Sequence, residues 1–185
     1  MLTFLGHAGF MYETENEILL MDPWMSNTGA FDSSWYQFPS NHLLGDDVRK
    51  LIETTDKKVY IYISHEHKDH FDVPYLKTLD LSKINFITPK FRRDHVASVL
   101  NELNPKSVTT PIDSEVLNIG EMEIRLFLDD QEIVRDSALG LIDKENDFTF
   151  LNLNDCKVYD RVDELKSIFK KFDVFTCQFS GAVFH

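Results

Sequence analysis

The sequence predicts a single domain with a layered α/β fold built on mixed sheets, and three observations support this prediction. Its 185 residues are enough for one domain with a substantial core and too few for two independent domains. Hydrophobic residues make up 43% of the chain, which is typical of a globular protein. Strand patterns cluster towards both ends of the chain, with helical patterns between them. We therefore expect one layered domain over residues 1–185.

The first elements are two short strands, Thr3–Phe10 and Glu17–Met21, which are expected to form an antiparallel hairpin around a polar turn. Residues 25–41 follow, and they are rich in Ser, Asn, Gly, Pro and aromatic residues without a clear period. That composition predicts a long ordered loop, and such loops often border functional sites. The exposed aromatic candidates of this region are Trp24, Trp35 and Tyr36.

Helices and strands alternate in the middle of the chain. Apolar residues at helical spacing predict helices over 43–54, 74–79 and 92–103. Runs rich in β-branched and aromatic residues predict strands over 58–64 and 84–88.

Strand patterns dominate from residue 107 onwards. A helix is expected over 160–172 and a last strand over 174–178. The strands expected before them cover residues 108–109, 116–119, 122–128, 138–142 and 148–153.

Four metal-ligand side chains lie within six residues directly after the strand over 58–64: His65, His67, Asp69 and His70. Imidazole and carboxylate together suit zinc, iron or manganese. In a loop at the end of a strand, His65 and His67 can turn toward one ion while Asp69 and His70 turn toward a second. Two ions roughly 3.5 to 4 Å apart can share one hydroxide and polarise a carbonyl or phosphoryl oxygen. The cluster therefore predicts a metal site, whereas a lone histidine would predict only a surface or core residue.

The segment Ser64-His65-Glu66-His67-Lys68-Asp69-His70 resembles the HxHxDH signature of the metallo-β-lactamase superfamily. Two further segments, 5–10 and 19–24, are similar to the opening of the branch that contains ascorbate-6-phosphate lactonases and CMP-N-acetylneuraminate hydroxylase. The resemblance covers nearly the whole chain. It implies an αββα sandwich made of two similar halves.

The resemblance also implies a set of metal ligands. His65 and His67 would bind the first ion, Asp69 and His70 the second, and Asp155 after the strand over 148–153 would bridge both. One or two zinc ions are the expected cofactor, with iron or manganese as alternatives.

Three residues receive roles around these ligands. Asp22 would lie behind them as a carboxylate that orients ligating imidazoles and raises their basicity. Asp69 would have a second, catalytic role, since a carboxylate beside a metal-bound hydroxide can orient it or accept its proton. His7 would line the pocket.

The chain departs from the superfamily pattern where a further histidine ligand is usual. That place reads Leu128-Asp129-Asp130-Gln131. Either Asp129 or Asp130 ligates the first ion instead, which would shift its preference from zinc toward iron or manganese, or both are turn residues. Both alternatives remain open, and of the two residues Asp130 is named as the candidate ligand of the first ion.

The end of the chain is the second departure, because the second half of the sandwich enters a strand and loop and then stops. His185 is not expected to be the last histidine ligand of the superfamily. The chain is then either a fragment with a missing C-terminal portion or a shortened member. In both cases apolar sheet surface would be exposed, and a partner chain or a homo-oligomer contact could cover it.

The first functional hypothesis is a metal-dependent hydrolase that uses a metal-bound hydroxide on a small-molecule ester, lactone, amide or phosphoester. An alternative is a protein related to the nucleotide-sugar or sialic-acid hydroxylases, based on the similarity of 153–155 and 178–182 to that branch. Those relatives use a Rieske iron–sulfur centre, for which this chain supplies no Cys and His ligands. A non-catalytic metal-binding domain is the third hypothesis.

Composition excludes several other classes. The formal net charge of -12 argues against a nucleic-acid partner, because such binding depends on Lys and Arg. No apolar run reaches the roughly 20 residues of a membrane-spanning helix. Cys156 and Cys177 are too few for a disulfide framework, and the first residues lack a signal-peptide pattern, so a cytoplasmic location is expected.

Overall fold

A computed structural model describes residues 1–131 and 135–178 of the chain. His185 and residues 179–182, to which sequence predictions were attached, lie outside the described residues. The chain forms two compact units, Met1–Ile112 and Asp113–His185. That the two units belong to one domain stays a prediction.

The N-terminal unit is built on a six-stranded sheet whose strands lie in chain order. The first three strands pair antiparallel, and the third to sixth pair parallel, so the sheet is mixed. The strands are β1 (Leu2–Gly6), β2 (Gly9–Glu13), β3 (Glu17–Met21), β4 (Lys58–Tyr62), β5 (Ile84–Ile87) and β6 (Ser107–Thr109).

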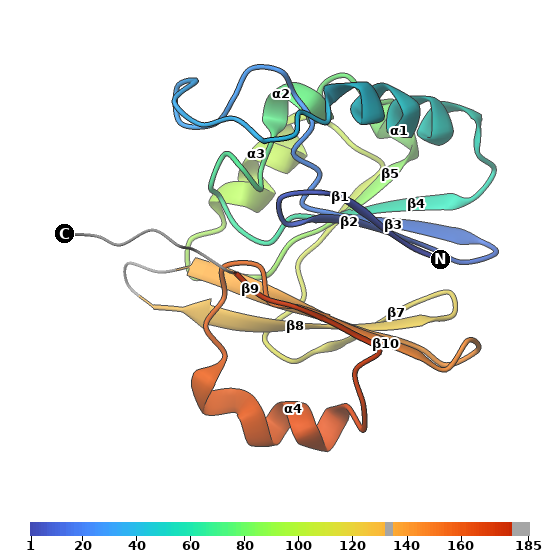
Figure 1. The fold of residues 1–185 in the computed structure, drawn as a ribbon, viewed down its shortest axis with the longest axis vertical. Helices are drawn as coiled ribbons and strands as arrows, with labels where there is room; N and C mark the ends of the chain where they lie inside the picture. Colours follow the sequence, from blue (N-terminus) through green and yellow to red (C-terminus); the bar gives the residue numbers. More distant parts are fainter. Residues whose placement is uncertain (132–134, 179–185) are drawn as a thin grey trace. The chain divides into compact units, whose positions relative to one another are not determined.

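Three helices cover one face of this sheet: α1 (His42–Thr54), α2 (Val73–Leu76) and α3 (His95–Glu102) (Figure 1). A 3-10 turn, Leu81–Lys83, precedes β5. Helical spacing explains the packing, because Val48 and Ile52 of α1 lie one turn apart and are both buried. They join alternate residues of the strands, such as Ile18 and Ile61, in one apolar core.

The predicted strand Thr3–Phe10 was wrong, because the structure divides it into β1 and β2. A tight turn separates them, with Gly6 at φ 113° and His7 at φ 51°. Gly6 adopts this backbone conformation without the steric penalty of a side chain, which a count of alternating apolar residues does not register. Phe4 pairs with Phe10 across the resulting hairpin, and His7 lies at its tip.

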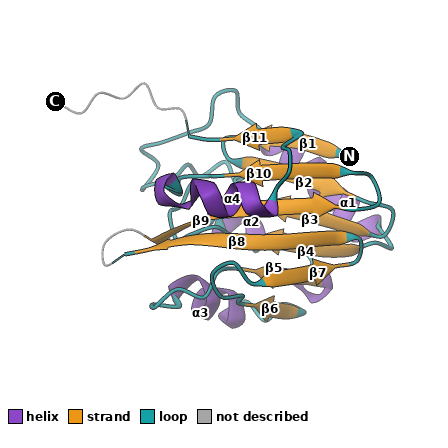
Figure 2. Cartoon of the chain, turned by 90° about the horizontal axis from the view of Figure 1, so that it is seen from below, coloured by secondary structure: helices purple, strands orange, loops and turns teal. Residues whose placement is uncertain are grey.

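The C-terminal unit contains a five-stranded sheet in the order β11-β10-β9-β8-β7. All neighbours pair antiparallel except β10 and β11, which are parallel. Helix α4 (Val162–Ile168) lies across one face of this sheet (Figure 2). The strands are β7 (Val116–Ile119), β8 (Met122–Asp130), β9 (Arg135–Asp143), β10 (Phe148–Asn152) and β11 (Val174–Thr176).

The helix predicted over 160–172 is shorter in the structure. It begins after a 3-10 turn, Tyr159–Arg161, and ends where Phe169 turns to extended backbone. Phe169 is buried and packs with Phe127 and Leu151 in the core of this unit. The helical pattern favours a longer helix, whereas burial of the Phe169 ring in this core favours the extended backbone at which the helix ends. The helix predicted over 92–103 begins only at His95.

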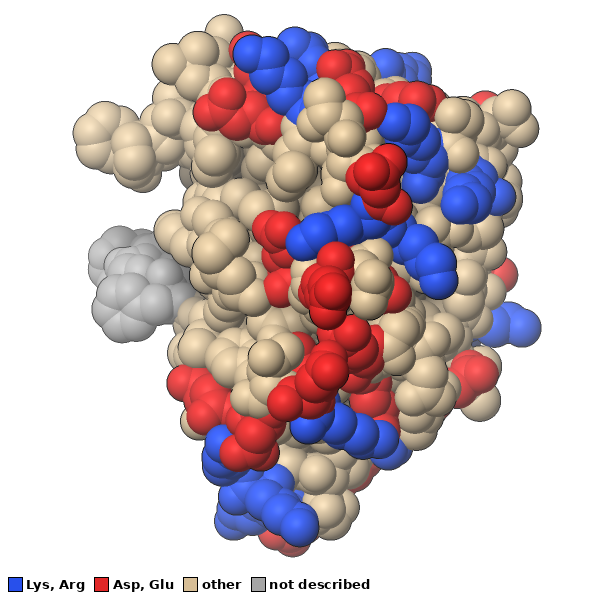
Figure 3. Space-filling view, turned by 90° about the vertical axis from the view of Figure 1, so that its right-hand side faces the viewer, with Lys and Arg blue, Asp and Glu red and all other residues tan. Residues whose placement is uncertain are grey.

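The predicted fold class is confirmed as a mixed α/β architecture with two sheets and few helices. In residues 1–131 and 135–178, no helix combines the length and apolar character required to cross a membrane. Lys and Arg side chains on the face drawn in Figure 3 lie among Asp and Glu rather than in a patch of their own.

Candidate metal centre

The histidine cluster leaves the sheet at the carboxyl end of β4. Ile63 still donates a backbone hydrogen bond to Ile87, and the chain then turns, with the backbone N–H groups of His70 and Phe71 both bonded to the carbonyl of His67. This turn brings the motif side chains together at the edge where parallel strands commonly place ligands. His65, Asp69 and His70 are buried, whereas His67 is exposed.

His65 and His67 point ring nitrogens at one another, with His65 Nε2 2.8 Å from His67 Nδ1. Two such atoms converging from one loop can bind the same cation. Burial, followed by the neighbouring His70 and His67, lowers the pKa of the His65 imidazole to about 2, against the opposing effect of Asp69. The ring is therefore neutral at ordinary pH, which is the form that ligates metals.

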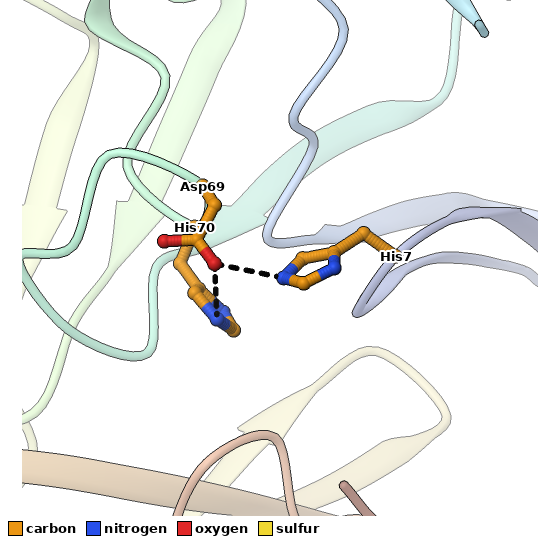
Figure 4. Close-up of side chains that lie close together, drawn as sticks. All are labelled: His7, Asp69 and His70. Atoms are coloured by element: carbon orange, nitrogen blue, oxygen red, sulfur yellow. Dashed lines mark hydrogen bonds and ion pairs between the residues drawn. The ribbon is translucent and has the colours of Figure 1, made fainter. Parts of the chain in front are cut away.

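A second group comprises His7, Asp69 and His70 (Figure 4). One ligand atom from each lies within 4.8 Å of the others. His7 Nε2 lies 2.9 Å from Asp69 Oδ2, and His70 Nε2 lies 3.6 Å from the same oxygen. The sequence prediction placed His7 in the pocket wall only, whereas the hairpin turn brings its ring to 2.9 Å from Asp69 of the motif.

Asp69 presents one oxygen that is not used. Its Oδ1 atom is buried and has no hydrogen-bond partner among the described residues. Burial alone would raise the pKa of the Asp69 carboxyl, but the hydrogen bond to His7 and the charges of His70 and His7 outweigh it and hold that pKa below its usual value. A buried carboxylate oxygen without a partner is unfavourable unless a cation or a water satisfies it. The imidazole and carboxylate donors of both groups therefore fit a divalent metal ion.

Asp22 lies behind the cluster, at the end of β3. Its Oδ2 atom accepts a hydrogen bond from Nδ1 of His70 at 2.8 Å, and its Oδ1 atom accepts one from the backbone N–H of Ser64 at 2.7 Å. Asp22 is 1% exposed. The predicted role of Asp22, to orient the ligating imidazoles, stays a prediction.

Two aromatic rings from the loop over 25–41 lie beside the exposed histidines of the cluster. The ring centroid of His7 lies 5.7 Å from that of Trp35, and Phe31 lies 6.1 Å from His67. Phe31 and Trp35 stack on each other at 5.9 Å and stay 40% and 49% exposed. Trp24 was expected to be exposed and is instead buried, because its ring packs edge-on against His7 and Trp35.

The loop that presents these rings has a strained backbone. Three consecutive non-glycine residues, Phe31, Asp32 and Ser33, have φ values of 50°, 56° and 63°. Hydrogen bonds between the backbones of Ala30 and Trp35 close the segment. Such conformations are unfavourable for side chains other than glycine and concentrate at functional sites. The sequence carries no signal for this run, since none of the three residues is glycine.

The two remaining candidates lie in the C-terminal unit. Asp155 follows β10 on a turn in which Asn154 has φ 50° and donates its side-chain amide to the carbonyl of Ser137 at 3.1 Å. Asp155 also lines a cavity of about 480 Å³ in that unit. Asp130 is the last residue of β8 and pairs with Arg135 of β9. The ligand roles of Asp155 and Asp130 stay predictions.

A family model described as a β-lactamase superfamily domain matches residues 1–159. The chain belongs to the metallo-β-lactamase superfamily. The superfamily that the HxHxDH motif predicted is therefore confirmed.

Three curated relatives are similar to this superfamily member. A Mycobacterium tuberculosis protein, provisionally named a Rieske 2Fe-2S iron–sulfur protein, is 32% identical over 191 residues, which cover 100% of this chain and 35% of the relative. The chain therefore spans about a third of that protein's length. Cytidine monophosphate-N-acetylneuraminic acid hydroxylase of Mus musculus is 33% identical over 42% of this chain and 12% of its own. A metal-dependent hydrolase of the UPF0173 group from Paracoccus denitrificans is 33% identical over 37% of this chain and 24% of its own.

Two solved structures have a fold similar to that of this superfamily member. A possible metal-dependent hydrolase of Veillonella parvula superimposes with a TM-score of 0.70 at 14% identity, over 94% of this superfamily member and 69% of that chain. The diiron β-hydroxylase CmlA of Streptomyces venezuelae gives a TM-score of 0.65 at 16% identity, over 94% of this chain and 33% of its own. At these identities the likeness concerns the fold alone.

Proposed function

We propose that this chain is a metal-dependent hydrolase domain that cleaves an ester, lactone, amide or phosphoester of a small molecule. The observation that carries the proposal is the convergence of ligand atoms at one edge of the sheet. His65 and His67 form one pair, and His7, Asp69 and His70 form a group beside it. His65, His67, Asp69 and His70 are the proposed metal ligands of the N-terminal unit, and His7 is proposed to hold Asp69 in place through its hydrogen bond. The similarity to a metal-dependent hydrolase supports the reaction class.

A bound divalent ion would supply a Lewis acid that lowers the pKa of water and polarises the scissile carbonyl or phosphoryl group. Zinc is the first choice for a donor set rich in imidazole, and iron or manganese are the alternatives.

Asp69 is the proposed catalytic carboxylate. Its Oδ2 atom is held at 2.9 Å by His7, which leaves Oδ1 to orient the attacking water or to accept its proton. The lowered pKa of its carboxyl keeps it ionised, as a proton acceptor must be.

The exposed rings of Phe31 and Trp35 are the proposed binding surface for the apolar or planar part of the substrate. They lie beside His67 and His7, on the open side of the cluster. Strain in residues 31–33 supports a functional reason for this arrangement.

A second candidate is a domain of a larger oxygenase related to the sialic-acid hydroxylases. The 32% identity to a provisionally named Rieske protein over this whole chain favours it. A Rieske centre takes two cysteines and two histidines, whereas this chain has only Cys156, which is buried, and Cys177. Such a cluster would have to be supplied outside the 185 residues.

Metal analysis tests the first proposal. The full chain, purified without chelator or nickel affinity, is compared by plasma mass spectrometry with His65→Ala/His67→Ala and with the control His42→Ala/His95→Ala, which removes two exposed histidines outside the cluster. We expect about one to two equivalents of zinc, iron or manganese in the wild type and the control, lost in the first variant. Absence of metal, even after reconstitution, would make the hydrolase proposal wrong. Bound metal without turnover on esters, lactones, amides and phosphoesters would favour a non-catalytic metal-binding domain.

A further inference from the structure

The hydroxyl of Ser64 lies between the Asp22 carboxylate and the His65 ring. Its Oγ atom is 2.5 Å from Asp22 Oδ2 and 2.9 Å from His65 Nδ1. All three residues are at most 1% exposed. Ser64 is the first residue of the motif segment and is not one of its predicted metal ligands.

The direction of these hydrogen bonds follows from the number of protons. A carboxylate can only accept, so the single hydroxyl proton of Ser64 points to Asp22. Ser64 Oγ can then only accept from the His65 ring, which places a proton on Nδ1 of His65. The neutral ring consequently carries its lone pair on Nε2, the atom that faces His67 Nδ1.

The same carboxylate oxygen contacts a second histidine without an intermediary. Asp22 Oδ2 accepts from Nδ1 of His70 at 2.8 Å, so Nε2 is the nitrogen of that ring left to bind a metal. Asp22 Oδ1 is already bonded to the backbone N–H of Ser64. The Ser64 hydroxyl thus connects His65 to Asp22, and it also lies 3.5 Å from Nδ1 of His70.

We propose that Ser64 is a positioning residue through which Asp22 fixes the tautomer of His65, in parallel with its direct effect on His70. One buried carboxylate thereby directs the Nε2 lone pairs of two histidines to the proposed metal centre. The reason for this arrangement rests on the proposed function, whereas the tautomers themselves can be observed in the metal-free protein. Outer partners of this kind raise ligand basicity and hold the ring orientation.

The test compares wild type, Ser64→Ala, Ser64→Thr and the control Thr88→Val as full-length, metal-free proteins. Ser64→Ala removes the hydroxyl and keeps the backbone N–H that bonds Asp22. Thr88 is a matched control, because its hydroxyl is fully buried after the neighbouring strand β5 and makes no hydrogen bond in the described part of the chain. Histidine tautomers are read from ¹⁵N chemical shifts, and zinc affinity from competition with a chromophoric chelator.

In Ser64→Ala we expect His65 to lose its pure Nδ1–H tautomer while His70 keeps its own, since the contact of His70 with Asp22 is direct. Zinc affinity should fall about 10- to 100-fold. Ser64→Thr should restore the His65 tautomer, and Thr88→Val should change neither property.

An unchanged His65 tautomer in Ser64→Ala would overturn the proposal, as would an equal change in His70 or in Thr88→Val. If the protein takes up no metal, the proposed function fails, and the tautomer comparison still decides the role of Ser64.

Discussion

His7 Nε2 lies 2.9 Å from Asp69 Oδ2, although 62 positions separate the two residues in the chain. The contact joins the tip of the β1–β2 hairpin to the histidine motif, and it assigns His7 a role that the motif alone does not include. Because His7 holds one oxygen of Asp69, the other oxygen is left for the proposed metal centre.

Replacement of His7 by alanine should therefore lower both metal content and kcat/KM. We expect a loss of about 10- to 100-fold in kcat/KM on the best substrate of the panel, with His95→Ala as the matched control. His7→Gln keeps a side chain that can donate a hydrogen bond to Asp69 and should lose less. Equal activity of wild type and His7→Ala would contradict the role of His7.

Trp35→Ala should weaken the binding of substrates that carry an aromatic ring. Aromatic pairs contribute about 0.5–1.5 kcal/mol beyond buried area, so KM for an aryl ester should rise up to about tenfold while the matched alkyl ester is little affected. Phe38→Ala is the control, since Phe38 is 99% exposed and belongs to the same loop. If the two variants behave alike, Phe31 and Trp35 do not form the substrate surface.

Cys156 should resist alkylation in the folded protein. Burial, with the nearby Asp136 and Asp129 as smaller causes, raises the pKa of its thiol to about 12. At pH 8 the reactive thiolate is then about one part in 10,000, and it grows as the pH rises toward that value. Mass spectrometry after iodoacetamide treatment should show labelling of the exposed Cys177 alone, and of both thiols in denaturant. Rapid labelling of Cys156 in the native state would contradict its burial.

Arg161 should stabilise the C-terminal unit. Its side chain bonds Asp113 at 2.7 Å and Glu164 at 2.9 Å, and it lies 5.1 Å above the ring of Phe127. The guanidinium is largely buried while both carboxylates are partly exposed, so Arg161→Ala should cost about 1–3 kcal/mol in the free energy of unfolding. Lys171→Ala, at an exposed ion pair, should have a smaller effect than Arg161→Ala in the same urea titration.

The same network predicts a dependence on pH. Hydrogen bonds from Arg161 and Ser114 lower the pKa of Glu164 below its ordinary 4.5. A lowered folded-state pKa means that the contribution is complete above 4.5 and is lost as the pH falls through the folded value. The difference in stability between wild type and Arg161→Ala should therefore shrink on acidification below 4.5. A difference that stays constant down to pH 2 would show that Glu164 is not a significant partner.

The parts of the fold that could be predicted are those with a local, periodic cause. Helix α1 and the strand before the motif follow from apolar spacing, and the density of ligand residues at 65–70 predicts the metal cluster. The turn at His7 could not be predicted in this way, because it depends on the backbone of Gly6 and on the pairing of β1 with β2.

The rest of the candidate site depends on contacts between distant segments. Trp24 is aromatic and adjacent to a loop, which favours exposure, and only the packing of His7 and Trp35 against it explains its burial. The role of Ser64 depends on the position of Asp22, 42 residues earlier, and no spacing rule relates the two.

The parallel register of β3 and β4 places Met21 opposite Tyr62, and therefore brings Asp22 next to the residues that lead into the motif. In a pleated sheet a shift by one residue moves every side chain of a strand to the opposite face. A chain that folded with these two strands misaligned would keep all its histidines and still separate them from the carboxylate that orients them. Metal binding by this protein would then be a measure of correct strand alignment, because a misaligned chain would bind the cation poorly.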